Sequence, residues 1–252
     1  MSGPLKQEDG AKDELFAERL EKIGDFDFGE RTVAVFDDML ERSVPMYSEI
    51  QRMVGELVAD VAQSGDEIYD LGCSTCNTFI EIDAHLPKEV CLRFVGLDNS
   101  EQMLNTARSK METVKLRHDC EFRLADLNQA IEISNARVVI MTLTLQFVRP
   151  MRREALLRTI YEGMVHNGLF VIVEKVLGEH STFNRLFIKH YYEMKKRCGY
   201  SELEIAQKRD ALENVLIPYR YSENVALLRD VGFSQIDTFF KWYNFCGMVA
   251  IK

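Results

Sequence analysis

Three acidic residues in the first half of the chain, Asp70, Asp98 and Asp126, each follow a short apolar run. Gly72 and Ser74 come directly after the first of them, and a helix-like apolar pattern begins a few residues later. This order is typical of a strand, a tight turn and the start of a helix. The turn lets the backbone approach a ligand, and the free N–H groups of the helix point at it. The sequence therefore predicts a pocket for a small polar ligand at this point.

The spacing of glycine around this turn restricts the class of ligand. A dinucleotide site needs the pattern G-x-G-x-x-G so that the pyrophosphate can lie against bare backbone, whereas here Gly72 is followed by Ser74 and Cys76. The turn is therefore not typical of an NAD or FAD site. Its order D-L-G-C-S resembles the first motif of class I S-adenosylmethionine-dependent enzymes, whose ligand lacks phosphate and offers an ammonium and a carboxylate. An ordinary turn of an α/β protein is the alternative interpretation.

The other two acids each have a binding and a structural interpretation. Asp98 follows a predicted strand at the edge where the ligand crevice of a parallel sheet lies, so it can accept hydrogen bonds from both ribose hydroxyls or cap the next helix. Asp126 holds the matching place after the following strand. It can bind an adenine amino group while the Leu127 N–H binds a ring nitrogen, or it can be a surface turn residue. The distance from Asp70 to Asp98 suits one β–α–β unit, which favours the ligand roles.

Composition limits the size and the partners of the protein. The 252 residues suit one α/β domain with extensions, and the 46% of hydrophobic residues can form a sizeable core. The formal net charge of -9 is acidic for a protein that must bind a phosphate backbone by counterion release. We therefore expect a small-molecule ligand and no direct binding of nucleic acid.

The cysteines show no disulfide or metal framework. All 6 are scattered, and although Cys73 and Cys76 form a C-x-x-C pair, no second pair and no suitably spaced histidines accompany it. We therefore expect no metal site. No signal peptide or long apolar run is evident, so the sequence predicts a cytoplasmic protein with reduced cysteines and no membrane contact.

Strand and helix patterns alternate along most of the chain, which predicts a mostly parallel sheet with helices on both faces. The end differs, because two neighbouring strands follow the last helix with no helix between them. Such a terminal antiparallel pair belongs to the class I methyltransferase fold, not to a dinucleotide-binding Rossmann domain. The predicted strands cover residues 68–71, 92–97, 121–124, 138–141, 169–173, 236–240 and 243–251.

The chain before the first predicted strand divides into an arm and a helical extension. Residues 1–28 are polar and predict a loose arm with a helix up to about Leu20. Two helices should follow, the second starting at Ser43 with Pro45 in its first turn. We expect residues 29–252 to form a single S-adenosylmethionine-binding domain with a helical insert near 181–218.

The segment 199–215 contains an unusual arginine. Ser201 and Glu204 form an S-x-x-E capping box, so a helix should run from Glu202 towards Leu216. Its periodicity places Arg209 on the same face as three apolar residues. A buried arginine requires an anion, so either this side chain extends to water or pairs with Glu213, or it binds an anionic ligand. Spacing alone favours the structural interpretation.

Five segments together resemble the carboxy-S-adenosyl-L-methionine synthase family, which has the class I methyltransferase fold. The resemblance covers nearly all of the chain from Phe26 onward, and the last segment is the specific one. The matching segments are R-S-V-P-M-Y-S at 42–48, D-L-G-C-S at 70–74, L-D-N-S at 97–100, T-L-Q-F at 144–147 and G-Y-S-E-L-E-I-A-Q-K-R-D-A-L-E-N-V at 199–215.

The resemblance implies an unusual reaction in which S-adenosylmethionine is a substrate and not a methyl donor. Prephenate would lose a carboxyl group and become phenylpyruvate, and the deprotonated sulfonium methyl would capture the carbon dioxide. A separate tRNA enzyme would then transfer the carboxymethyl group to a wobble uridine.

The family also implies a homodimer. It further implies these contacts: Tyr47 over the cofactor, Gly72, Cys73 and Ser74 along its methionine part, Asp98 and Asn99 on the ribose, Asp126 and Leu127 on the adenine, and Arg209 on the new carboxylate, with Asp70 and Thr142 also in the site.

Two positions depart from the family pattern. Cys76 stands where the family has glycine, so it adds a side chain at a close approach, and Thr142 replaces an asparagine with a group that makes fewer hydrogen bonds. Two other functions stay open at this point. One is a conventional methyltransferase acting on a small acid, and the other is a catalytically silent ligand-binding or scaffold protein.

Overall fold

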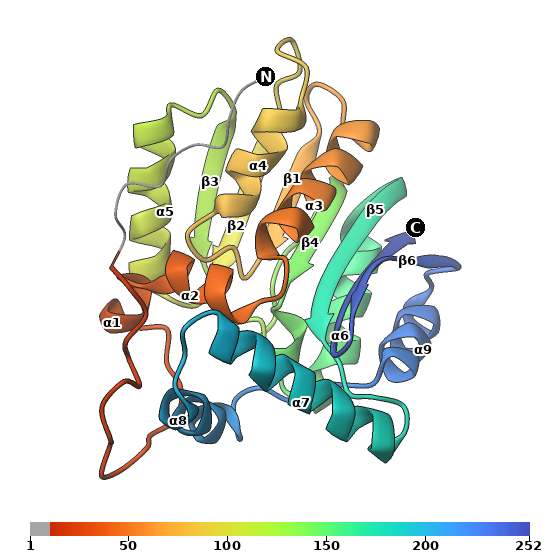
Figure 1. The fold of residues 1–252 in the computed structure, drawn as a ribbon. Coiled ribbons are helices and arrows are strands. Elements are labelled where there is room, and N and C mark those ends of the chain that lie inside the picture. The colour runs from red at the N-terminus through yellow and green to blue at the C-terminus, as the bar shows by residue number, and fades with distance from the viewer. Residues whose placement is uncertain (1–10) are drawn as a thin grey trace.

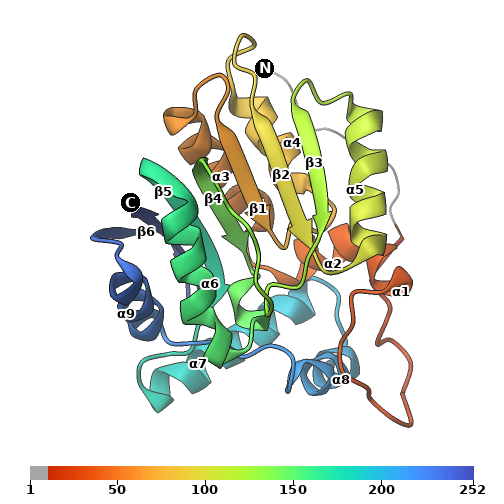
Figure 2. The same cartoon turned by 180° about the vertical axis from the view of Figure 1, so that it is seen from behind.

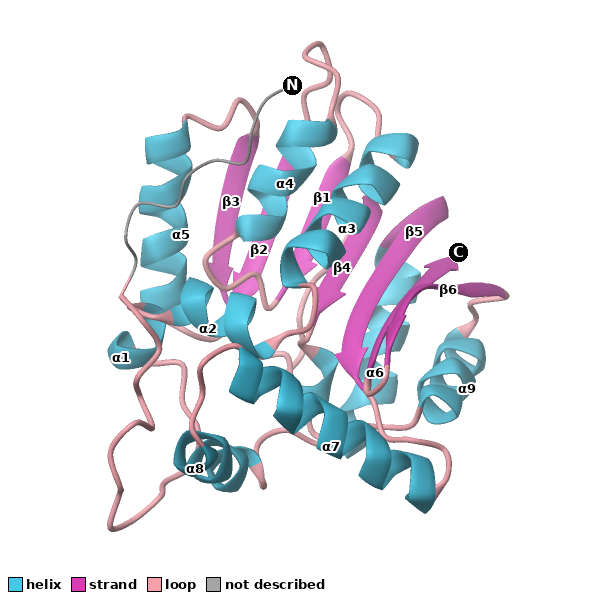
Figure 3. Ribbon diagram, viewed as in Figure 1, coloured by secondary structure: helices cyan, strands magenta, loops and turns pink. Residues whose placement is uncertain are grey.

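The fold is organised on one sheet of seven strands. In the computed structural model, which describes residues 11–252, the strand order is β3-β2-β1-β4-β5-β7-β6 (Figures 1 and 3). Only β7 runs against the other strands, and it lies between β5 and β6. The predicted sheet with its antiparallel C-terminal pair is therefore confirmed. The strands are β1 (Glu67–Leu71), β2 (Arg93–Asp98), β3 (Asp119–Leu124), β4 (Ala136–Thr142), β5 (Met164–Lys175), β6 (Gln235–Trp242) and β7 (Phe245–Ile251).

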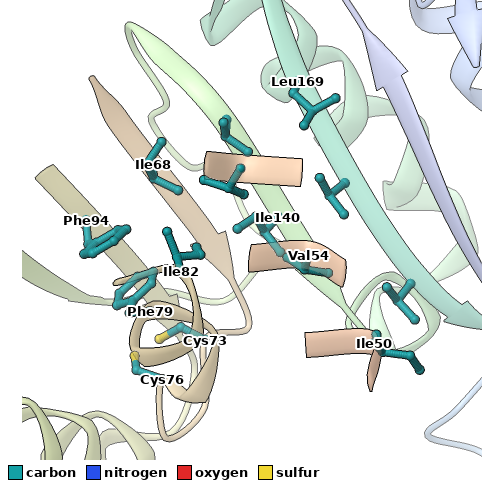
Figure 4. Packing of buried hydrophobic residues seen from close by; sticks show 14 of the residues in the cluster. Ile50, Val54, Ile68, Cys73, Cys76, Phe79, Ile82, Phe94, Ile140 and Leu169 are labelled. Carbon is teal, nitrogen blue, oxygen red and sulfur yellow. The ribbon is translucent and has the colours of Figure 1, made fainter. Parts of the chain in front are cut away.

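Helices cover both faces because side chains alternate along each strand. Ile68 packs in one core cluster with α3, α4 and α5, whereas its neighbour Tyr69 packs in the other with α6 and α9. Figure 4 shows part of the first cluster, in which Ile50 and Val54 of α3 approach the strands. Figure 2 shows α6 and α9 on the opposite face. These helices are α3 (Tyr47–Val61), α4 (Asn77–His85), α5 (Glu101–Val114), α6 (Pro150–Gly163) and α9 (Tyr221–Val231).

The remaining helices gather at the carboxyl edge of the parallel strands. There α7 (Ser181–Arg197) crosses below the ends of β4 and β5, and α8 (Glu202–Leu212) lies beside the N-terminal arm (Figure 1). The helices α1 (Glu30–Val33) and α2 (Phe36–Ser43) border the same edge. None of the described helices is long and apolar enough to cross a membrane.

The predicted helix in the arm is wrong for the described residues. Residues 11–28 contain no helix, and residues 1–10 lie outside the described part. The arm instead binds α8: the Gln207 side chain accepts the Leu20 N–H and donates to the carbonyls of Phe16 and Glu18. These bonds satisfy three backbone groups of the arm without a helix.

The predicted helix start at Ser43 is also wrong. Ser43 is the last residue of α2 and its hydroxyl donates to the Met39 carbonyl, while α3 begins at Tyr47 after Met46 in a left-handed conformation. A short α1 also precedes these two helices. The serine closes one helix and does not cap the next, since its hydroxyl bonds backward along the chain.

Helix α8 confirms the capping box but corrects the face of the arginine. The Ser201 hydroxyl accepts the Glu204 N–H, and the Glu204 carboxylate accepts the Ser201 N–H. The helix ends at Leu212, earlier than predicted. The Arg209 side chain is 59% exposed and pairs with Asp210 rather than Glu213, whereas Lys208 is the buried cation of the helix. The cation that packs inward is therefore Lys208, one residue before the predicted Arg209.

We predict that Ser201→Ala lowers the free energy of unfolding by about 1 kcal/mol, because the Glu204 N–H loses its cap. Chemical denaturation with a circular dichroism readout measures this change. Ser181→Ala is the matched control, since Ser181 is exposed at the start of α7 and its side chain makes no cap bond there. Equal stability of the two variants would contradict the capping role.

Candidate active site

The turn after β1 requires its glycine. Gly72 has a φ of +80°, and a Cβ at this position would lie 2.5 Å from the Thr144 hydroxyl oxygen. A side chain would therefore be both strained and in collision with the loop after β4. Two residues later, Ser74 also has a positive φ, of 49°. The chain thus brings bare backbone to the carboxyl end of β1, as the sequence predicts.

Cys76 departs from the family pattern without entering the site. It adopts a left-handed conformation with a φ of 61°, which glycine would adopt more easily. Its side chain is fully buried in the core near Phe79 (Figure 4), and it is not among the residues that line the cavity described below. Cys73 is buried beside it and does line the cavity. A hydrogen bond with Cys76 and burial raise the pKa of the Cys73 thiol.

Asp98 joins the first two β–α turns. One of its carboxylate oxygens accepts the Ser74 N–H at 2.9 Å, and the other accepts the Ser100 N–H at 2.9 Å. Ser100 itself caps α5, with its hydroxyl accepting the Met103 N–H. The predicted cap of α5 is thus Ser100 and not Asp98, which instead joins the two turns and keeps a further lone pair on each oxygen for a ligand. Burial raises the pKa of Asp98.

Asp70 is a buried acid with an unused hydrogen-bonding atom. The residue is 2% exposed, and its Oδ1 has no hydrogen-bond partner among the described residues. Burial, with a smaller contribution from the charge of Asp98, raises the pKa of Asp70 to about 7. A buried acceptor without a partner is costly, so a cationic ligand group here would be stabilised.

Glu174 fixes the loop after β4 by hydrogen bonds to its backbone. This buried carboxylate at the end of β5 accepts the N–H groups of Thr144, Leu145 and Gln146. The hydroxyl oxygen of Thr142, the last residue of β4, is buried and has no hydrogen-bond partner in the described structure. The loop is therefore fixed beside an unpaired hydroxyl at the cavity.

Asp126, the acid after β3, is more exposed to solvent than Asp70 and Asp98. Asp126 is exposed, and it accepts hydrogen bonds from the backbone N–H and the side-chain amide of Asn128. The backbone hydrogen bond is the main cause that lowers the pKa of Asp126. The neighbouring Leu127 is buried. Both residues line the cavity, together with the aromatic rings of Phe28 and Phe147, which are in edge contact.

One cavity brings together ten of the eleven predicted site residues. They are Tyr47, Asp70, Gly72, Cys73, Ser74, Asp98, Asn99, Asp126, Leu127 and Thr142. Arg209 is the exception, because it lies in a separate surface groove between α7 and α8 with Tyr192 and Glu193. Within one chain, the arginine therefore does not reach the cavity.

The cavity also contains cations that the sequence reasoning missed. Lys175, Lys195 and Lys208 all line it. Lys175 had a sequence signal, since it follows the apolar run of β5 in the way that the three acids follow theirs. Lys195 and Lys208 had none, because they lie on helices α7 and α8 that only the tertiary structure brings to the cavity.

The cavity residues fit S-adenosylmethionine. The unpaired Asp70 oxygen and Thr142 hydroxyl suit the polar groups of its methionine part, and Asp98 suits the ribose. The ligand is a cation at its sulfonium and ammonium groups, so a cluster of carboxylates at the carboxyl edge of β1 and β2 would stabilise it. The side chains therefore complement the charge and the hydrogen-bonding groups of this molecule.

Comparisons with known proteins agree with this fold. A family model described as a methyltransferase domain matches residues 68–168. The structure superimposes on a SAM-dependent methyltransferase from Aquifex aeolicus with a TM-score of 0.57 at 14% identity, covering 89% of this chain and 99% of that one. It also matches an O-methyltransferase family protein from Burkholderia thailandensis, with a TM-score of 0.64 at 13% identity and coverage of 87% and 60%. The fold and the site define a class I S-adenosylmethionine-dependent enzyme.

Sequence similarity specifies the family within this class. A carboxy-S-adenosyl-L-methionine synthase from Methylococcus capsulatus is 53% identical over 243 residues, which are 96% of this chain and 100% of that protein. One from Sulfurimonas denitrificans is 44% identical over 95% of this chain and 99% of that protein. The chain belongs to the carboxy-S-adenosyl-L-methionine synthase family, and it is an enzyme of the transferase class that uses S-adenosylmethionine.

We predict that the affinity for S-adenosylmethionine rises about tenfold between about pH 6 and pH 7.5. The pKa of Asp70 is raised to about 7, so this carboxyl is mostly neutral at the lower pH and gains the charge that attracts the ligand as the pH rises. Calorimetric titration at several pH values measures the dissociation constant. Asp70→Asn should bind more weakly, with little pH dependence. A wild-type profile as flat as that of the variant would contradict the assignment.

Proposed function

We propose that this enzyme converts S-adenosyl-L-methionine and prephenate to carboxy-S-adenosyl-L-methionine and phenylpyruvate. The observation that carries the proposal is the cavity, in which ten predicted ligand-binding residues meet within a chain 53% identical to a carboxy-S-adenosyl-L-methionine synthase. The lysines add support, because a cavity that binds only the cationic nucleoside has no need of three cationic side chains.

The reaction balances without an oxidant or a metal. The bond between the ring carbon of prephenate and its carboxyl group breaks, and carbon dioxide forms. The electron pair of this bond makes the ring aromatic as the ring hydroxyl group leaves as hydroxide. The hydroxide takes a proton from the sulfonium methyl to form water, and the resulting carbanion attacks the carbon dioxide. The products are phenylpyruvate, water and the carboxylated nucleoside. Enclosure by the cavity would retain the carbon dioxide until the new bond forms.

The product would serve a tRNA carboxymethyltransferase that modifies a wobble uridine to 5-oxyacetyluridine. This step belongs to a separate cytoplasmic enzyme in the proposal. The net charge of -9 supports the division, because an acidic protein is poorly suited to bind the tRNA backbone.

A conventional methyltransferase acting on a small acid is the second candidate. It would use the same nucleoside-binding residues, and the position of Arg209 outside the cavity favours it within a single chain. The two candidates differ in their products: a methyl transfer leaves S-adenosylhomocysteine, whereas carboxylation retains every atom of the nucleoside except the displaced proton.

A homodimer would reconcile the position of Arg209 with a carboxylate-binding role. Its side chain is 59% exposed, so it is available to the cavity of a second copy. Arginine matches a carboxylate with two parallel hydrogen bonds. We therefore include in the proposal that Arg209 of one subunit binds the new carboxylate in the cavity of the other.

Incubation of the enzyme with S-adenosylmethionine and prephenate should yield a nucleoside heavier by one carbon dioxide, together with phenylpyruvate. Mass spectrometry of the nucleoside measures the first product and ultraviolet absorption the second. Prephenate labelled with ¹³C at its ring carboxyl should transfer the label, and omission of prephenate is the control. Formation of S-adenosylhomocysteine and a methylated acid would establish the second candidate, and absence of any turnover would indicate a silent binding protein.

A mixed dimer tests the role of Arg209. One chain carries Asp98→Ala and the other Arg209→Ala, and two affinity tags isolate the heterodimer. If the arginine acts across the interface, one intact site forms and the heterodimer has about half the wild-type activity, while both variant homodimers are nearly inactive. A heterodimer as inactive as the Arg209→Ala homodimer, or a monomeric wild-type enzyme, would contradict the arrangement.

A further inference from the structure

Three lysines from different parts of the chain converge on one end of the cavity. Lys175 is the last residue of β5, Lys195 is in the last turn of α7, and Lys208 is on α8. Figure 1 shows α7 and α8 below the end of β5. Lys195 and Lys208 are 5% and 6% exposed, and Lys175 is half-buried. Such burial is rare for lysine unless the side chain has a partner.

Two tyrosine rings connect the ammonium groups. The Lys175 Nζ lies 5.0 Å from the centre of the Tyr191 ring, and the Lys195 Nζ lies 5.8 Å from the same ring. The Lys195 Nζ lies 4.9 Å from the centre of the Tyr200 ring, and the Lys208 Nζ lies 5.6 Å from it. The three charges therefore form one cluster over two aromatic faces, which stabilise cations only weakly.

Among the described residues, Lys208 is the one of the three lysines that forms a salt bridge. Asp13 of the arm is 2% exposed and lies 3.3 Å from the Lys208 Nζ. Within residues 11–252, the ammonium groups of Lys175 and Lys195 form no salt bridge and no hydrogen bond. Burial lowers the pKa of Lys175 to about 8, and burial with the charges of Lys208 and Lys175 lowers the pKa of Lys195 to about 7. An anion between them would offset the cost of this burial.

We propose that Lys175 and Lys195 form the subsite that binds a carboxylate of the second substrate, namely the carboxylate that prephenate keeps and phenylpyruvate retains. The inference rests on the proposed function, because that function supplies the dicarboxylate. Asp13 neutralises Lys208, which leaves the other two ammonium groups to the substrate. The acids Asp70 and Asp98 line the same cavity, so it offers opposite charges to a cationic nucleoside and an anionic acid.

The reaction decides which of the two carboxylates the lysines hold. The leaving carboxylate must lose its negative charge as carbon dioxide forms, so an ion pair with it would stabilise the ground state more than the transition state and would slow the reaction. The retained carboxylate keeps its charge throughout, and an ion pair there positions the substrate without a kinetic penalty. The lysines therefore suit the side chain that becomes the pyruvate part of the product.

Phenylpyruvate is the appropriate probe, because it carries the retained carboxylate and lacks the leaving one. In calorimetry with S-adenosylmethionine present, Lys195→Met and Lys175→Met should each weaken phenylpyruvate binding by about tenfold to a hundredfold, which is the value of a charge-assisted hydrogen bond. The KM for prephenate should rise in parallel. Lys88→Met is the matched control, since Lys88 is exposed in the loop between α4 and β2, and it should change neither quantity.

Two further measurements separate a binding role from a structural one. Methionine fills the space of lysine without a charge, so neither variant should lower the melting temperature, and the dissociation constant of S-adenosylmethionine should stay within about twofold. Lys195→Arg retains the charge and should recover part of the phenylpyruvate affinity. Unchanged phenylpyruvate binding in both Met variants would overturn the proposal, as would a large loss of stability with loss of nucleoside binding.

The same experiments distinguish this inference from the proposed function. If the wild-type enzyme forms no carboxylated nucleoside, the proposed function fails, yet the phenylpyruvate titrations still show whether the lysines bind a carboxylate. If turnover occurs but the Lys195→Met variant weakens binding of the carboxylated nucleoside and not of phenylpyruvate, the lysines hold the new carboxylate and the inference is wrong.

Discussion

The site depends on two hydrogen bonds that the Asp98 carboxylate accepts. This carboxylate accepts the backbone N–H of Ser74 with one oxygen and that of Ser100 with the other, and so it ties the turn after β1 to the start of α5. Both bonds are charge-assisted, and the bond to Ser100 is buried and the bond to Ser74 partly buried, which makes them stronger than bonds between neutral groups in water. The left-handed turn at Gly72 has no side chain of its own to hold it. The Gly72 and Cys73 N–H groups donate to the Leu97 carbonyl, so the turn is held both by the backbone of β2 and by the acid at its end.

The acidic and the basic side chains of the cavity come from different elements of the fold. Asp70 and Asp98 lie at the ends of β1 and β2, and Lys175, Lys195 and Lys208 come from β5, α7 and α8. A nucleoside cation and a carboxylic acid would therefore each meet side chains of opposite charge in one cavity. Such interactions are stronger inside a cavity than at the surface. The division would allow an acidic protein to bind the proposed anionic substrate.

The helical insert and the arm complete the cavity as one connected unit. Gln207 of α8 binds the arm backbone at Leu20, and Asp13 of the arm binds Lys208 and the Tyr200 hydroxyl. The Arg42 side chain joins this network by donating to the Asp13 carbonyl. The arm that the sequence predicts to be loose is therefore tied to the insert by polar contacts.

The sequence by itself determined the succession of strands and helices along the chain, the turn at Gly72 and the acids at the strand ends, because these features depend on local patterns and on the common edge of parallel strands. Only the tertiary structure decided that Lys208 faces inward while Arg209 faces outward, and that Lys195 reaches the cavity. Neighbouring residues on a helix point about 100° apart, so the packing of α8 against the arm selects the buried cation. No local pattern contains that choice, because the partners lie almost 200 residues away in the chain.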